Sequence, residues 1–284
     1  MPNADPGKPS AAIGASRREL ALRLASALLL APLALGVAYI GGSPFAVFWG
    51  LAALGIFWEW TWLVVPARRV SVLTIGTAAL LVSLALGGYG RWAAALIVLA
   101  AAAAAIAAVA PVHRAWSAAG VPYAGAIGMA PTVLRSDAEE GFLALILLFA
   151  IVWATDSAAY FVGRCIGGPR LLPRVSPGKT WSGAVGGLVG AVLAAVVVAG
   201  IAGLPSVPAL AGIAVALSAF AQAGDLFESL LKRRFGAKDS SRLIPGHGGL
   251  MDRLDGFVAA AALAALIGIL RGGIEAPGRG LLVW

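Results

Sequence analysis

Cysteine, histidine and charge are all scarce in this sequence. It holds one cysteine, Cys165, and two histidines, His113 and His247. A single cysteine excludes an intrachain disulfide and any zinc site built from cysteine pairs, and two histidines are too few for a histidine metal cluster. Charged residues make up 12% of the chain, whereas soluble domains carry about 25%. An ordinary soluble fold is therefore disfavoured.

Apolar residues are abundant, at 60% of the chain with a mean hydropathy of +0.91. They gather in runs long enough to cross a bilayer as helices, and these runs are too uniformly apolar for barrel strands. We predict an all-α polytopic integral membrane bundle of about nine transmembrane helices. The predicted spans are Leu24–Ile40, Phe45–Val65, Val72–Leu86, Trp92–Ala110, Gly120–Leu134, Gly141–Phe161, Trp181–Ile201, Val207–Ala223 and Leu254–Leu270. Gly120–Leu134 is short and holds two prolines, so a re-entrant segment is an alternative there.

The basic residues orient these spans, because cytoplasmic loops are enriched in Lys and Arg. With the N-terminus inside and the C-terminus outside, all but four of the 21 Lys and Arg residues fall on the cytoplasmic side. The exceptions are Arg91, Arg135, Arg271 and Arg279. We expect three regions: a polar cytoplasmic tail (1–23), N-terminal membrane helices (24–134) and a C-terminal catalytic region (135–284).

One polar segment stands out at the cytoplasmic end of the last two spans. Asp225, Glu228, Ser229 and Lys232 follow helical spacing and share one stripe. The stripe could be an ordinary amphipathic helix end with an ion pair between Glu228 and Lys232. Its carboxylates could equally ligate a hard cation such as Mg²⁺, which prefers one or two carboxylates together with phosphates and waters.

The loop that follows is basic and ends in a glycine-rich turn around His247. Its cations could simply anchor the chain at anionic headgroups, and the turn could be a generic tight turn. Glycines there also permit close backbone approach to a bound anion. Asp252 and Asp255 then open the next helix as i, i+3 neighbours. Carboxylates, cations and a glycine turn at one membrane face together predict a metal-assisted reaction on phosphates.

A second cytoplasmic loop is predicted to complete the site. Asp156 is expected to be buried at the inner end of the sixth span. Ser176, Lys179 and Thr180 precede a predicted helix N-terminus, which is a natural phosphate site. The GxxxxGK[ST] pattern of a Walker A loop is missing.

These residues resemble the phosphatidate cytidylyltransferases. The resemblance is carried by Ser229 to Asp239, by Pro245 to Asp255, by the D-S-A-A-Y-F-x-G-R stretch from Asp156 and by S-P-x-K-T-W from Ser176. It covers most of the C-terminal half. The family usually has Lys at position 178 and Glu at position 182, where this chain has Gly178 and Ser182, which puts the usual contacts of that loop in doubt.

The resemblance implies that CTP and phosphatidate react with Mg²⁺ to give CDP-diacylglycerol and pyrophosphate, in the cell (inner) membrane with the site facing the cytoplasm. A second cation is left open, membrane lipids are partners, no nucleic acid is expected, and a homodimer is a further expectation. The implied catalytic residues are Asp225, Asp252, Lys232 and Arg233, with Asp225, Asp252 and Asp255 as metal ligands. The implied substrate-binding residues are Ser229, Lys238, Asp239, His247, Gly248, Arg253, Ser176, Lys179, Thr180 and Asp156.

Two other functions remain open. A CTP-dependent polyprenol or phytol kinase is disfavoured by the spacing from Pro245 to Asp255. A transporter could use Glu59 and Asp156 as gating acids, but transporters usually place polar groups near the membrane midplane, whereas here they gather at one face.

Overall fold

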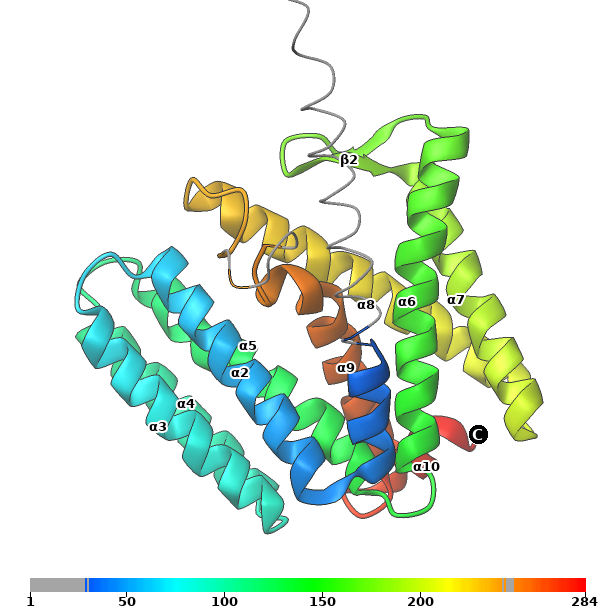
Figure 1. Ribbon diagram of the computed structural model, residues 1–284, viewed down its shortest axis with the longest axis horizontal. Helices are drawn as coiled ribbons and strands as arrows, with labels where there is room; N and C mark the ends of the chain where they lie inside the picture. Colours follow the sequence, from blue (N-terminus) through cyan, green and yellow to red (C-terminus); the bar gives the residue numbers. More distant parts are fainter. Residues whose placement is uncertain (1–28, 30, 242, 244–247) are drawn as a thin grey trace, which may run out of the picture.

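The computed structural model describes residues 29, 31–241, 243 and 248–284 and is almost entirely helical (Figure 1). The N-terminal half contains α2 (Gly42–Val64), α3 (Arg69–Gly88), α4 (Trp92–Val109) and α5 (Arg114–Ser136). The C-terminal half contains α6 (Gly141–Ile166), β1 (Arg170–Leu172), β2 (Ser176–Thr180), α7 (Trp181–Ala202), α8 (Val207–Arg234), α9 (Met251–Gly272) and α10 (Pro277–Leu282).

Seven helices within the described residues are long and apolar enough to cross a membrane: α2, α3, α4, α6, α7, α8 and α9. The all-helical prediction is therefore confirmed, but the count of about nine is not. Of the predicted span Leu24–Ile40, a short helix over Ala31–Ile40 is seen, and residues 24–28 and 30 lie outside the described part of the chain. The span Gly120–Leu134 lies within α5, which is continuous through Pro122 and Pro131 but is less apolar than the seven.

The long helices pack side by side, and most of the packed pairs are consecutive in the chain (Figure 1). The most extensive packing is between α6 and α7, followed by α2 with α5, α8 with α9, and α3 with α4. Aromatic rings join three of the helices, because Phe257 of α9 stacks on Trp49 of α2 at 4.9 Å and on Phe149 of α6 at 5.3 Å between ring centroids. This contact holds α2 alongside α9.

The predicted polar stripe is confirmed as helical. The apolar run ends at Ala223, but α8 continues to Arg234, so Asp225, Glu228 and Lys232 belong to one helix. A short antiparallel hairpin of β1 and β2, which the sequence did not predict, connects α6 to α7. The predicted helix start after Thr180 is confirmed, since the Thr180 hydroxyl accepts a hydrogen bond from the Gly183 N–H at 3.1 Å.

Small residues explain the close approach of α6 and α7, as expected for membrane helices. A Cβ added at Gly190 would lie 2.5 Å from the Ala158 Cβ, and one added at Gly186 would lie 2.6 Å from the Val162 Cβ. The Ala158 Cβ is bonded to backbone and cannot rotate away, so Gly190 sets the distance between the two helices.

We expect Gly190→Ala to lower the thermal unfolding temperature of the detergent-purified protein, because overpacking costs about 1–3 kcal/mol. Gly200→Ala is the matched control in the same helix, since an added Cβ there meets nothing within 4 Å and alanine favours helix over glycine. Unfolding followed by tryptophan fluorescence checks this. Equal unfolding temperatures for the two variants would contradict the packing argument.

Candidate functional site

Five aspartates from three helices and a loop line one polar cavity of about 340 Å³. Its lining residues are Asp156 of α6, Asp225 and Lys232 of α8, Asp239 of the following loop, and Asp252, Arg253 and Asp255 of α9. All seven were predicted as site residues from the sequence, and the fold brings them together. The predicted burial of Asp156 is wrong, because its side chain is exposed where it faces this cavity.

A larger cavity of about 780 Å³ adjoins the first, and Asp156 and Asp225 line both. Its other charged residues are basic: Arg164 near the end of α6, and Arg170 and Lys179 in the hairpin. The hairpin folds over the start of α7 because Trp181 N–H bonds the Pro169 carbonyl at 3.0 Å. An acidic and a basic cavity therefore meet at the same two aspartates.

An ion pair crosses the boundary between these cavities. Lys179 of β2 pairs with Asp225 of α8, so a predicted phosphate-binding residue contacts a predicted metal ligand. The contact ties the hairpin to α8, although the two lie more than 40 residues apart in sequence. In the sequence, Lys179 and Asp225 belong to two separate motifs, and their contact could not be predicted from spacing.

Lys232 lies between two carboxylates. Its Nζ is 2.6 Å from Glu228 Oε2 and 2.6 Å from Asp252 Oδ1. The ion pair between Glu228 and Lys232, one of the two alternatives for the stripe, is therefore present, and α9 supplies a second partner. The Glu228 side chain is 1% exposed and the Lys232 side chain 13%. Because burying a charge is costly unless it is paired, Lys232 offsets the cost for both acids.

The second oxygen of Asp252 contacts the chain on both sides of residues 242–247, at Ser240 and at Gly249. Oδ2 accepts hydrogen bonds from Ser240 N–H at 3.0 Å, Ser240 Oγ at 2.9 Å and Gly249 N–H at 2.7 Å. Gly248 has a φ of +79°, which favours glycine, and a Cβ there would lie 2.8 Å from Asp252 Oδ2. Glycine at 248 therefore permits the close approach of loop and carboxylate.

Several predicted site residues line neither cavity. Arg233 is exposed and donates to the Ala237 carbonyl at 3.3 Å, Lys238 is exposed, and Ser176 sits in β2. Ser229 is half-buried on α8. His247 lies outside the described residues, together with 242 and 244–246.

Glu59 was predicted only as a gating acid of a transporter, and its place in the structure is different. It is fully buried and accepts hydrogen bonds from Ser240, Ser241, Leu250 and Met251. The signal in the sequence was a single charged residue in an otherwise apolar helix, which is rarely without a function. Which partners it would find could not be inferred from local spacing.

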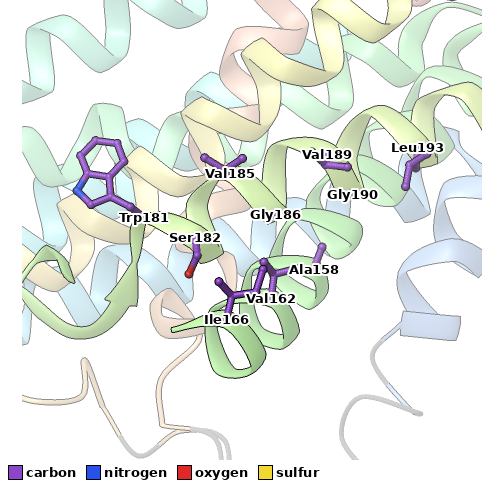
Figure 2. A pocket seen from close by; sticks show the side chains of 10 residues that line it. All are labelled: Ala158, Val162, Ile166, Trp181, Ser182, Val185, Gly186, Val189, Gly190 and Leu193. Atoms are coloured by element: carbon purple, nitrogen blue, oxygen red, sulfur yellow. The ribbon is translucent and has the colours of Figure 1, made fainter. Parts of the chain in front are cut away.

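A third hollow, of about 630 Å³, is an apolar groove between α6 and α7 (Figure 2). Val162 and Ile166 of α6 form one wall, and Val185 and Val189 of α7 lie across from them. Its lining contains no charged side chain, so it offers nothing that could bind or transform a phosphate. Such a surface suits contact with lipid.

Known proteins resemble this chain along most of its length. The chain matches the model of the cytidylyltransferase family over residues 21–270. A phosphatidate cytidylyltransferase of Brucella suis biovar 1 is 43% identical over 253 residues, covering 88% of this chain and 94% of the relative. One from Pseudomonas aeruginosa is 36% identical over 263 residues, covering 86% and 95%. One from Bacillus subtilis is 42% identical over 127 residues, covering 44% and 47%.

We expect Lys232→Met to destabilise the protein by roughly 3 kcal/mol, near the low end for breaking a buried ion pair, because Glu228 and Asp252 would face each other unpaired. The double variant Lys232→Met/Glu228→Gln should recover much of this loss, since one buried charge is removed. Denaturant unfolding of the single and double variants checks the coupling. Strictly additive losses would show that Lys232 does not neutralise Glu228.

Proposed function

The chain belongs to the cytidylyltransferase family, and on that premise we propose that its two adjoining cavities transfer cytidylate from CTP to phosphatidate. The products are CDP-diacylglycerol and pyrophosphate, and the protein is a nucleotidyltransferase of phospholipid biosynthesis. The observation that carries this proposal is the meeting of a basic and an acidic cavity at Asp156 and Asp225. Basic side chains can neutralise the phosphates of a nucleoside triphosphate. Carboxylate oxygens can hold a metal cation beside the phosphorus that reacts.

The position of the site fits a reaction between a soluble and a membrane-held substrate. The seven apolar helices make this a multi-pass membrane protein. The charged residues that line the two cavities lie toward the ends of α6 and α8, in the loop after α8, in the hairpin before α7 and at the start of α9. We place these residues at the cytoplasmic face of the inner membrane, and the distribution of Lys and Arg in the sequence supports this orientation.

The residues of the chain have distinct tasks in this reaction. Arg164, Arg170 and Lys179 line the larger cavity, where they bind the phosphates of CTP and neutralise charge on the leaving pyrophosphate. The attacking phosphatidate oxygen is already anionic, so no general base is needed. The site therefore acts by positioning and by charge stabilisation, which can account for a large part of such a barrier.

The site also fits Mg²⁺ as the cofactor, which remains part of the proposal. Within the described residues, no three Asp, Glu, His or Cys side chains already form a metal site. The donors that face the smaller cavity are nevertheless carboxylates, the ligands that Mg²⁺ prefers together with substrate phosphates and waters. Asp225, Asp252 and Asp255 would hold the ion, which supplies positive charge to the reacting phosphates.

Purified wild-type protein supplied with phosphatidate, labelled CTP and Mg²⁺ should form lipid-linked cytidylate and pyrophosphate. Asp225→Asn and Asp252→Asn should each lower kcat by about 100-fold or more, because each removes a proposed ligand of the cation that stabilises charge at the reacting centre. Glu139→Gln is the matched control: Glu139 is an exposed acid outside both cavities, and its loss should leave kcat unchanged.

Two results of the same assay would overturn the proposed cytidylyl transfer, and a third would overturn only the choice of Mg²⁺. The first is a wild-type protein that forms no lipid-linked cytidylate. The second is release of CDP with a phosphorylated lipid, which would identify a CTP-dependent lipid kinase. The third is full activity after chelation of divalent cations, which would reject Mg²⁺ while leaving cytidylyl transfer in place.

The proposed orientation can be tested with the single native cysteine. Cys165 is exposed near the end of α6, so a membrane-impermeant maleimide should label it in inverted vesicles but not in right-side-out vesicles. In the Cys165→Ser/Glu139→Cys variant, the new thiol precedes α6 and should show the opposite pattern. Labelling of Cys165 from the outside would place the site on the other face.

A further inference from the structure

We propose that Glu59, an acid of α2 that lines neither cavity, is a positioning residue that holds Ser240, Ser241 and the start of α9 in their reactive arrangement. This inference rests on the proposed cytidylyl transfer for its consequence in activity. Glu59 is the one charged residue of α2 and is 0% exposed. A buried carboxylate is costly unless its oxygens receive hydrogen bonds, so its partners indicate its role.

Within the described residues, the hydrogen-bond partners of Glu59 lie on either side of residues 242–247. Oε1 accepts from Ser241 Oγ at 2.6 Å and from Leu250 N–H at 2.8 Å. Oε2 accepts from Met251 N–H at 2.7 Å and lies 3.1 Å from Ser240 Oγ, whose single hydrogen it shares with Asp252 Oδ2. Each oxygen therefore contacts one serine hydroxyl from before residues 242–247 and one backbone N–H from after them.

The two backbone donors are N–H groups at the start of α9. Such groups have no partner within their own helix and are usually capped by a side chain of the preceding residue. Leu250 occupies that position in α9 and provides no side-chain cap. Glu59, from another helix, accepts instead from the N–H groups of this cap residue and of the first helical residue, and its negative charge suits the positive end of the α9 dipole.

Ser240 links this arrangement to the site. Its hydroxyl lies 3.1 Å from Glu59 Oε2 and 2.9 Å from Asp252 Oδ2. Asp252 also receives Gly249 N–H, and Gly249 packs so closely that an added Cβ would lie 2.7 Å from Glu59 Oε1. Moving Glu59 would therefore move Ser240, Gly249 and the first turn of α9, and with them Asp252.

The contacts argue against Glu59 as a gating acid in a transport path. A gating group needs access to water or to a passing solute, whereas the side chain of Glu59 is enclosed and its two oxygens are occupied by four donors. Within the described residues, the Ser240 hydroxyl lies between Glu59 and Asp252 and links the two acids.

Glu59→Gln is the sharpest variant because it keeps the size of the side chain. A glutamine has one accepting oxygen, and its NH₂ group would face a serine and a backbone N–H that also donate. We expect the variant to fold but to lower kcat by about 10- to 100-fold, since small misplacements of reacting groups have effects of this size. KM for CTP should change much less, because the cavity with Arg164, Arg170 and Lys179 is untouched.

Thr61→Val is the matched control. Thr61 is also fully buried in α2, two residues away, and its hydroxyl donates to the Phe57 carbonyl at 2.8 Å within the same helix. Its loss should lower stability without changing kcat.

Ser241→Ala removes the hydroxyl that donates to Glu59 Oε1. Combined with Glu59→Gln, it should cause little further loss of kcat, because both changes remove the same contact.

A readout without substrate separates this inference from the proposed function. Hydrogen–deuterium exchange of peptides covering residues 248–252 should accelerate in Glu59→Gln and stay unchanged in Thr61→Val. If the wild type forms no lipid-linked cytidylate but this exchange pattern appears, the proposed function fails while the positioning contact stands. Unchanged exchange, wild-type kcat in folded Glu59→Gln, or additive losses with Ser241→Ala would each overturn the inference.

Should Glu59→Gln fail to fold, Ser241→Ala decides the question. It leaves Glu59 charged and retains its three other donors, so the protein should fold and show a smaller kcat loss together with faster exchange at residues 248–252. Wild-type kcat and wild-type exchange in this variant would overturn the inference.

Discussion

The structure depends on how Asp252 is held at the start of α9. One of its oxygens contacts Lys232 at 2.6 Å, and the other accepts three hydrogen bonds from Ser240 and Gly249. A carboxylate at the end of a membrane helix is costly to bury without such partners. Lys232 of α8 and the N–H groups of Ser240 and Gly249 therefore together stabilise the buried carboxylate at this end of the bundle.

Some charges of the site are already paired within the protein before any substrate arrives. Lys232 is shared by Glu228 and Asp252, and Lys179 pairs with Asp225. Binding of a triphosphate with a cation would exchange these internal partners for substrate oxygens. Because the pairs involve α8, α9 and the hairpin, such an exchange would couple substrate binding to the relative position of these elements.

Apolar packing between the helices determines where these charged side chains lie. The close contact of α6 and α7 at Gly186 and Gly190 brings the hairpin over α8, and the rings of Trp49 and Phe257 hold α2 beside α9. Glu59 lies ten residues after Trp49, about 15 Å further along α2 at 1.5 Å per residue. The N-terminal half thus reaches this end of the bundle through Glu59, and also through the rings of Trp60 and Trp116, which stack on Phe227 of α8.

The sequence by itself determined the helical membrane architecture and the residues of the α8 stripe, because apolar run length and helical spacing are local properties. It also indicated the family, through the residue types and their spacing between Ser229 and Asp255. Only the tertiary structure decided that Asp156 faces a cavity, that Lys179 pairs with Asp225, and that Arg233 and Lys238 line neither cavity. The partners of Glu59 lie 181 to 192 residues away. Contacts at such separations depend on how helices pack, and no local pattern encodes them.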